Sequence, residues 1–112
     1  MTFDEARAAL LALPGVTEGS SYGTPGFKVG KKLLARFHQD GKSIVLFVGS
    51  IDERDMMLEA RPKLFHITNH YRDYPMLLAA CAKLTPEALK RLVEPRWREI
   101  APRSRRASAV KA

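Results

Sequence analysis

The chain has 112 residues, of which 46% are hydrophobic, and a formal net charge of +7. This length and composition are typical of one domain with a substantial core. The longest apolar run, residues 76–82, is too short to span a bilayer, and no signal-like segment opens the chain, so a soluble protein is expected. A single cysteine, Cys81, excludes an internal disulfide and suits a reducing compartment, which predicts a cytoplasmic location.

The positive charge is concentrated toward the C-terminus. Residues 1–82 hold ten Lys/Arg and nine Asp/Glu, whereas residues 83–112 hold nine Lys/Arg and three Asp/Glu. The sequence therefore predicts a single domain over residues 1–102 and a basic, flexible tail over residues 103–112.

The first half of the chain predicts one helix and then several short strands. Thr2-Phe3-Asp4-Glu5 has the spacing of a capping box and predicts a helix over residues 3–13, which Pro14-Gly15 ends. Glycine-punctuated segments then predict antiparallel strands over residues 17–22, 27–29, 32–37 and 43–48. Hairpin turns are expected at residues 29–32 and 39–42.

The second half predicts two more helices around two strands. Ser50-Ile51-Asp52-Glu53 is a second capping box and opens a helix that ends near residue 60. An edge strand over 63–68, a polar-aromatic loop over 69–75 and a strand over 76–84 follow. Thr85-Pro86-Glu87 then opens the last helix. The order α-β(3-4)-α-β(2)-α predicts an α+β fold, a two-layer sandwich.

Two motif-rich stretches carry a family resemblance. The first runs from Leu13-Pro14-Gly15 through Gly23-Thr24-Pro25-Gly26-Phe27 to Gly30-Lys31-Lys32 and ends at Phe37. The second is Phe65-His66-Ile67-Thr68 followed by His70-Tyr71-Arg72-Asp73-Tyr74-Pro75. Over residues 3–102 the chain resembles the MmcQ/YjbR family of small bacterial proteins. The resemblance implies an antiparallel sheet with helices on one face, similar to secretion-chaperone folds. The family commonly has a tryptophan before the position of Leu77, where this chain has Met76.

The family's DNA-binding label implies that two protruding β wings contact phosphates. The basic residues around the expected hairpins would make these contacts, and they are Lys28, Lys31, Lys32, Arg36 and Lys42. Arginines of the last helix and the tail would add to them, and they are Arg98, Arg103, Arg105 and Arg106. Such contacts are electrostatic and non-specific, and DNA is the partner predicted first. The alternative is that turn lysines keep strand edges soluble and that the last helix simply presents a solvated face.

Aromatic residues around the polar loop predict a shallow pocket for a ligand or peptide. The expected lining is Tyr22, Phe27, His70, Tyr71 and Tyr74. The alternative is that Tyr71 and Tyr74 pin the loop through their rings.

The strand over residues 76–82 is apolar on both faces, which favours a homodimer or a protein partner. Met76, Leu78 and Ala80 would face away from the helices, with Leu34, or Val45 and Phe47, beside them. The alternative is a small patch covered by longer side chains. The sequence has no Cys, His and carboxylate set with ligand spacing and no nucleophile beside a base, so we predict no metal, no cofactor and no enzymatic activity.

Overall fold

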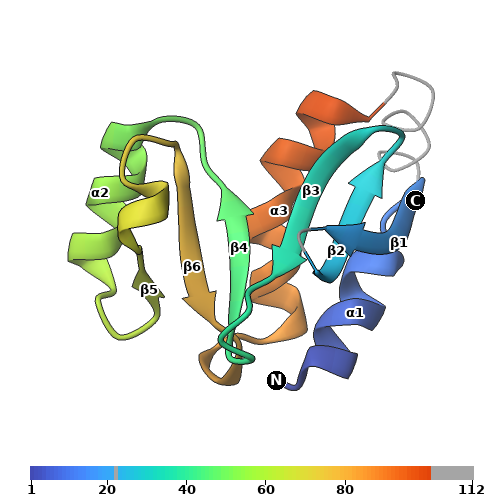
Figure 1. The fold of residues 1–112 in the computed structure, drawn as a ribbon, viewed down its shortest axis with the longest axis horizontal. Helices are drawn as coiled ribbons and strands as arrows, with labels where there is room; N and C mark the ends of the chain where they lie inside the picture. Colours follow the sequence, from blue (N-terminus) through green and yellow to red (C-terminus); the bar gives the residue numbers. More distant parts are fainter. Residues whose placement is uncertain (22, 102–112) are drawn as a thin grey trace.

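The computed structural model describes residues 1–21 and 23–101, which form three α-helices and a six-stranded sheet (Figure 1). The helices are α1 (Phe3–Leu11), α2 (Ile51–Ala60) and α3 (Pro86–Ile100). The strands are β1 (Val16–Ser21), β2 (Thr24–Val29), β3 (Lys32–Phe37), β4 (Ser43–Phe47), β5 (Phe65–His66) and β6 (Met76–Ala80). Two short 3-10 helices are η1 (Asn69–Tyr71) and η2 (Cys81–Lys83).

The sheet order is β1-β2-β3-β4-β6-β5, and every neighbouring pair is antiparallel. The predicted α+β fold is therefore confirmed. The two later strands are shorter than predicted, since β5 has only two residues and β6 ends at Ala80. The last residue of β6, Ala80, pairs with Ser43 of β4. The chain then turns into η2, where Leu84 N–H donates to the Cys81 carbonyl at 3.1 Å. No helix in the described ranges is both long and apolar enough to cross a membrane.

Local capping chemistry sets the helix starts. The hydroxyls of Thr2, Ser50 and Thr85 each accept an N–H from three residues further on, as the sequence predicts. The first helix ends at Leu11, two residues before the predicted end, because the Leu13 N–H donates to the Leu10 carbonyl at 3.2 Å, a three-residue turn that closes the helix. The last helix continues through Pro95 to Ile100.

The main core lies between the sheet and the pair α1 and α3, which pack on the same face of the sheet. Trp97 of α3 is 1% exposed, and its indole N–H donates to the Pro14 carbonyl at 2.9 Å. In contrast, α2 lies beside β5 and β6, at the left of Figure 1. Within residues 1–21 and 23–101, no α-helix packs flat across the other face of the sheet, which we call the open face.

Gly26 in β2 must be a glycine because two strands approach each other closely there. A Cβ added at Gly26 would lie 2.6 Å from Ser21 Cβ and 3.4 Å from Leu33 Cδ1. We expect Gly26→Ala to lower the unfolding free energy by about 1–3 kcal/mol. The Cβ of Ser21 is attached directly to the backbone, so it can give way only if the pairing of β1 with β2 is disturbed. The register partner of Gly26, Gly19, has open space within 4 Å, so Gly19→Ala is the matched control and should change stability little. Urea denaturation measures both, and equal effects would contradict this account.

Candidate binding groove

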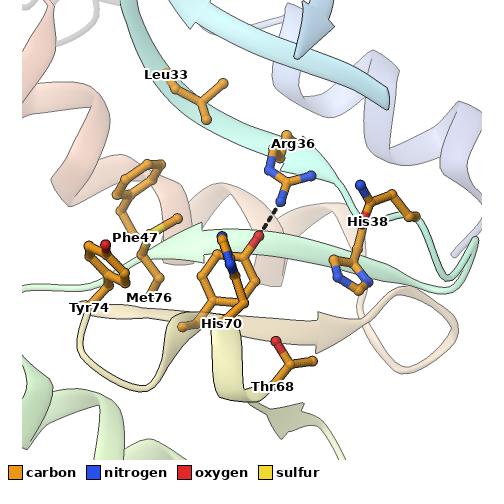
Figure 2. A pocket seen from close by; sticks show the side chains of 10 residues that line it. Leu33, Arg36, His38, Phe47, Thr68, His70, Tyr74 and Met76 are labelled. Carbon is orange, nitrogen blue, oxygen red and sulfur yellow. Dashed lines mark hydrogen bonds between the residues drawn. The ribbon is translucent and has the colours of Figure 1, made fainter. Parts of the chain in front are cut away.

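A groove lies on the open face, above β3, β4 and β6 and beside η1 (Figure 2). Its volume is about 750 Å³, within the range of pockets that bind small organic molecules. The residues that line it are Leu33, Arg36, His38, Gln39, Phe47, Thr68, His70, Tyr71, Tyr74 and Met76.

A β-bulge in β3 turns Arg36 toward the groove. Phe27 pairs with Ala35 and Lys28 with Leu33, so Leu34 has no opposite residue in β2. Leu34 and Ala35 both enter the core under the helices, and both are 0% exposed. Leu33 and Arg36 then share the open face although they are three residues apart. The expectation that Leu34 faces outward is wrong for this reason.

Tyr71 covers most of the apolar part of the open face. Its side chain packs over Val45 and Leu78, with Met76 beside them, and it is 3% exposed. The exposed large hydrophobic residues among those described are Leu11, Ile51, Met56 and Tyr74. The apolar surface on which the predicted homodimer or protein partner would dock is thus largely covered by the Tyr71 side chain of the same molecule. A partner at this face stays a prediction.

Arg36 forms a polar wall of the groove and is only 5% exposed. One of its terminal nitrogens donates to the Tyr71 hydroxyl, the contact dashed in Figure 2. The other lies 3.4 Å from Thr24 Oγ1 and 3.5 Å from the Phe37 carbonyl oxygen. The expectation that Arg36 projects from a hairpin toward DNA phosphates therefore disagrees with its position, because the bulge points it under Tyr71.

Arg54 of α2 holds the loop that carries the groove's aromatic residues. Its side chain is 5% exposed, and Nη1 lies 2.9, 3.0 and 2.8 Å from the carbonyl oxygens of Tyr71, Arg72 and Tyr74. Asp55 accepts from Nε and Nη2 at 3.1 and 3.0 Å. Sequence reasoning missed this residue, since an arginine between Glu53 and Asp55 is typical of a solvated helix face.

The remaining rings stand around Tyr71. The His70 ring meets Tyr71 edge-on with centroids 4.8 Å apart, and the His38 ring does so at 6.4 Å. Tyr74 is 54% exposed and forms the outer rim. The predicted pocket residues His70, Tyr71 and Tyr74 thus converge, whereas Tyr22 lies outside the described residues.

Phe27 does not belong to the pocket. It is 0% exposed and packs against Phe37 in the main core, with ring centroids 5.3 Å apart. Its ladder partner Ala35 faces the helices, and directly paired residues share a face, so Phe27 must face them too. The expectation that Phe27 lines a ligand pocket is wrong.

Asp40 organises the turn between β3 and β4 beside the groove. Its Oδ1 accepts from the N–H groups of Lys42 and Ser43 at 2.8 and 2.9 Å, and Oδ2 accepts from the Ser43 hydroxyl at 2.8 Å. Partial burial alone would raise the pKa of Asp40, but these hydrogen bonds, helped by His38, outweigh it and lower the pKa to about 2.

Asp40→Asn is therefore expected to lower the free energy of unfolding only at pH values at which the Asp40 carboxylate is charged in the folded protein. The folded-state pKa lies below the unfolded value of 3.8, so the stabilisation is complete above that value and is lost as the pH falls toward 2. Because the side chain is a third exposed, solvent screening should keep the effect below about 1 kcal/mol. Urea denaturation of both proteins from about pH 6 to about pH 2.5 should show the stability difference shrinking; a difference independent of pH would contradict this.

The predicted DNA-contacting lysines lie at two separate ends of β3. Lys31 and Lys32 are exposed at the β2–β3 turn, and Lys42 is exposed at the β3–β4 turn. A six-residue strand separates these turns by roughly 20 Å. Lys28 is half-buried and pairs with Leu33, which places it on the open face outside the groove lining.

The arginines of the last helix lie near the first of these turns. Arg96 Nε donates to the Leu33 carbonyl at 3.1 Å, which brings the end of α3 beside the start of β3. Its guanidinium also stacks on Phe47, 4.2 Å from the ring centroid. Arg98 is bonded to Glu94 at 2.7 Å. Arg103, Arg105 and Arg106, with the predicted tail, lie outside the described residues.

The comparisons with known proteins place the chain in a family. The YjbR family model matches residues 11–99, so the chain belongs to the YjbR family, as its motifs indicate. The crystal structure of Deinococcus radiodurans protein DR2400, with the family-model domain DUF419, is similar in fold. It has a TM-score of 0.70 and 18% sequence identity, over 96% of this chain and 86% of that one. No curated protein matches the chain significantly. Within the described residues, no group of three or more His, Cys, Asp or Glu is placed to hold a metal ion.

Proposed function

We propose that the protein is a small-molecule-binding domain and that the open-face groove is its binding site. The observation that carries this proposal is the convergence of a buried cation, hydroxyl groups and aromatic rings in one cavity of about 750 Å³. Mostly apolar cavities with a few fixed polar groups are the usual form of such sites. The groove is also held in place from outside, since Arg54 fixes the loop and the bulge fixes Arg36.

The test is a ligand-observed NMR screen of small aromatic compounds against the full chain and two variants. Tyr74→Ala removes the exposed ring from the groove rim, while its backbone carbonyl stays available to Arg54. We expect hits to weaken by about fivefold, because a ring contact contributes roughly 1 kcal/mol. Met56→Ala is the matched control, since Met56 is 68% exposed on α2 and lies outside the groove. Hits that Tyr74→Ala and Met56→Ala affect equally, or no hits at all, would refute the proposal.

A second candidate function is electrostatic, non-specific DNA binding. The observation in its favour is the contact between Arg96 and Leu33, which sets Lys31 and Lys32 beside the end of α3. Against it, residues 1–101 carry fifteen Lys/Arg and twelve Asp/Glu, so the described body has little net charge. Lys31 and Lys32 could contact phosphates through their charge and the length of their side chains alone.

Fluorescence anisotropy of a labelled random duplex across several salt concentrations tests the second candidate. Binding at the β2–β3 turn predicts that Lys32→Ala reduces the salt slope by about 0.9, one phosphate contact, while Lys42→Ala at the other end of β3 does not. A chain ending at Pro102 separates the contribution of the C-terminal arginines. Absence of binding near physiological salt would remove this candidate.

A further inference from the structure

The one permanently charged side chain among the residues that line the groove is Arg36. The lining also has donors on Gln39, Thr68 and Tyr71 and two imidazole rings, but no aspartate or glutamate. The acid nearest in the chain, Asp40, lies outside the lining: its carboxylate is bonded to Lys42 and Ser43 in the turn, and Oδ2 is 3.4 Å from Nδ1 of the groove residue His38. Ligand recognition here would therefore rely on donors and positive charge, which suits an acceptor or an anion.

The lining is also divided in space. Figure 2 shows Phe47, Tyr74 and Met76 gathered at one end and Arg36 and His38 at the other, with the Arg36 contact to Tyr71 between them. The first end offers ring faces and a thioether, which favour a flat apolar body. The second end offers a planar guanidinium and a phenol hydroxyl.

We infer that the groove binds an aromatic carboxylate, with the carboxylate at Arg36 and Tyr71 and the ring system over Phe47 and Met76. This inference rests on the proposed function of the groove. A carboxylate is favoured over a phosphate because Arg36 lines the groove but is only 5% exposed and is already bonded to Tyr71, so an anion with two oxygens is easier to satisfy there than one with three or more. Guanidinium groups match the geometry of carboxylates closely.

Isothermal titration with matched probes tests the inference on the full chain. The probes are 2-naphthoate, its neutral isostere 2-naphthamide, 2-naphthyl phosphate and acetate. We expect 2-naphthoate to bind at least about tenfold more tightly than the amide, because charge-assisted hydrogen bonds are roughly twice as strong as neutral ones. We also expect it to bind more tightly than acetate, which lacks the ring.

Two variants locate the charge that makes this difference. Arg36→Met should bring the acid-to-amide ratio close to one, whereas Lys28→Met removes a cation from the same sheet face but outside the groove and should keep the ratio. If Arg36→Met does not fold, Arg36→Lys takes its place as the variant. Whether the groove prefers the acid to the amide is in any case decided by the ratio of affinities measured on the unchanged chain.

The outcomes separate the inference from the proposed function. Equal binding of acid and amide, with both weakened by Tyr74→Ala, would overturn the carboxylate while leaving the groove as a binding site. Tighter binding of the naphthyl phosphate would assign the anion end to phosphate esters and also overturn the inference. If no probe binds and the wider screen gives no hits, the proposed function itself fails.

Discussion

Replacing Arg54 with methionine is expected to lower the unfolding free energy by about 2–4 kcal/mol and to loosen the loop over residues 69–75. Methionine keeps the apolar stem of the side chain but removes every donor. The carbonyl groups of Tyr71, Arg72 and Tyr74 would then lose the cation that bonds all three. Buried acceptors without a donor are costly, and this explains the size of the effect.

Urea denaturation gives the stability change, and amide hydrogen exchange shows where the structure opens. Exchange should accelerate first in η1 and the residues after it, before β6 is affected. Arg61→Met is the matched control, since Arg61 is an exposed arginine just after the same helix, and we expect it to change stability by less than about 0.5 kcal/mol. Uniform acceleration across the sheet would mean that Arg54 supports the whole fold and not this loop.

The contact between Arg36 and Tyr71 is expected to give the second large effect. In a double-mutant cycle, Arg36→Met and Tyr71→Phe should each cost about 1–3 kcal/mol, because each leaves a buried polar partner behind. The double variant should cost less than the sum, with a coupling energy of about 1–2 kcal/mol. Both residues are at least 95% buried, so solvent replaces the lost bond poorly.

A variant pair outside the groove checks that the cycle reports this contact. Arg98 and Glu94 form an exposed pair at 2.7 Å, for which we expect a coupling of only about 0.3–0.5 kcal/mol. If Arg36 and Tyr71 are no more strongly coupled than this surface pair, the groove wall is not rigid in solution.

The fold could be predicted because its signals are local. Thr2, Ser50 and Thr85 each cap a helix through a residue three positions on, and such spacing is visible in the chain. The resemblance to the family then predicted the antiparallel sheet with helices on one face. In contrast, the lengths of β5 and β6 depend on where their partners end, which the sequence does not display.

The site could be predicted only in part because its key orientations depend on tertiary pairing. The aromatic loop was recognisable from His70, Tyr71 and Tyr74. The side of the sheet on which Arg36 lies is set by the β-bulge where β3 pairs with β2. Alternation of residues along β3 alone does not indicate this bulge. Arg54 acts on residues 17 to 20 positions away, so its neighbours in sequence could not reveal its role.

Amide chemical-shift changes on the full chain, mapped as 2-naphthoate or the best hit of the screen is added, would show directly where a ligand binds. We expect the changes to concentrate at residues 33–39 and 68–76, which surround the groove, and Tyr74→Ala to reduce them. Changes centred on the β2–β3 turn and α3, or spread evenly over the chain, would contradict the claim that the open face of the sheet is the binding site.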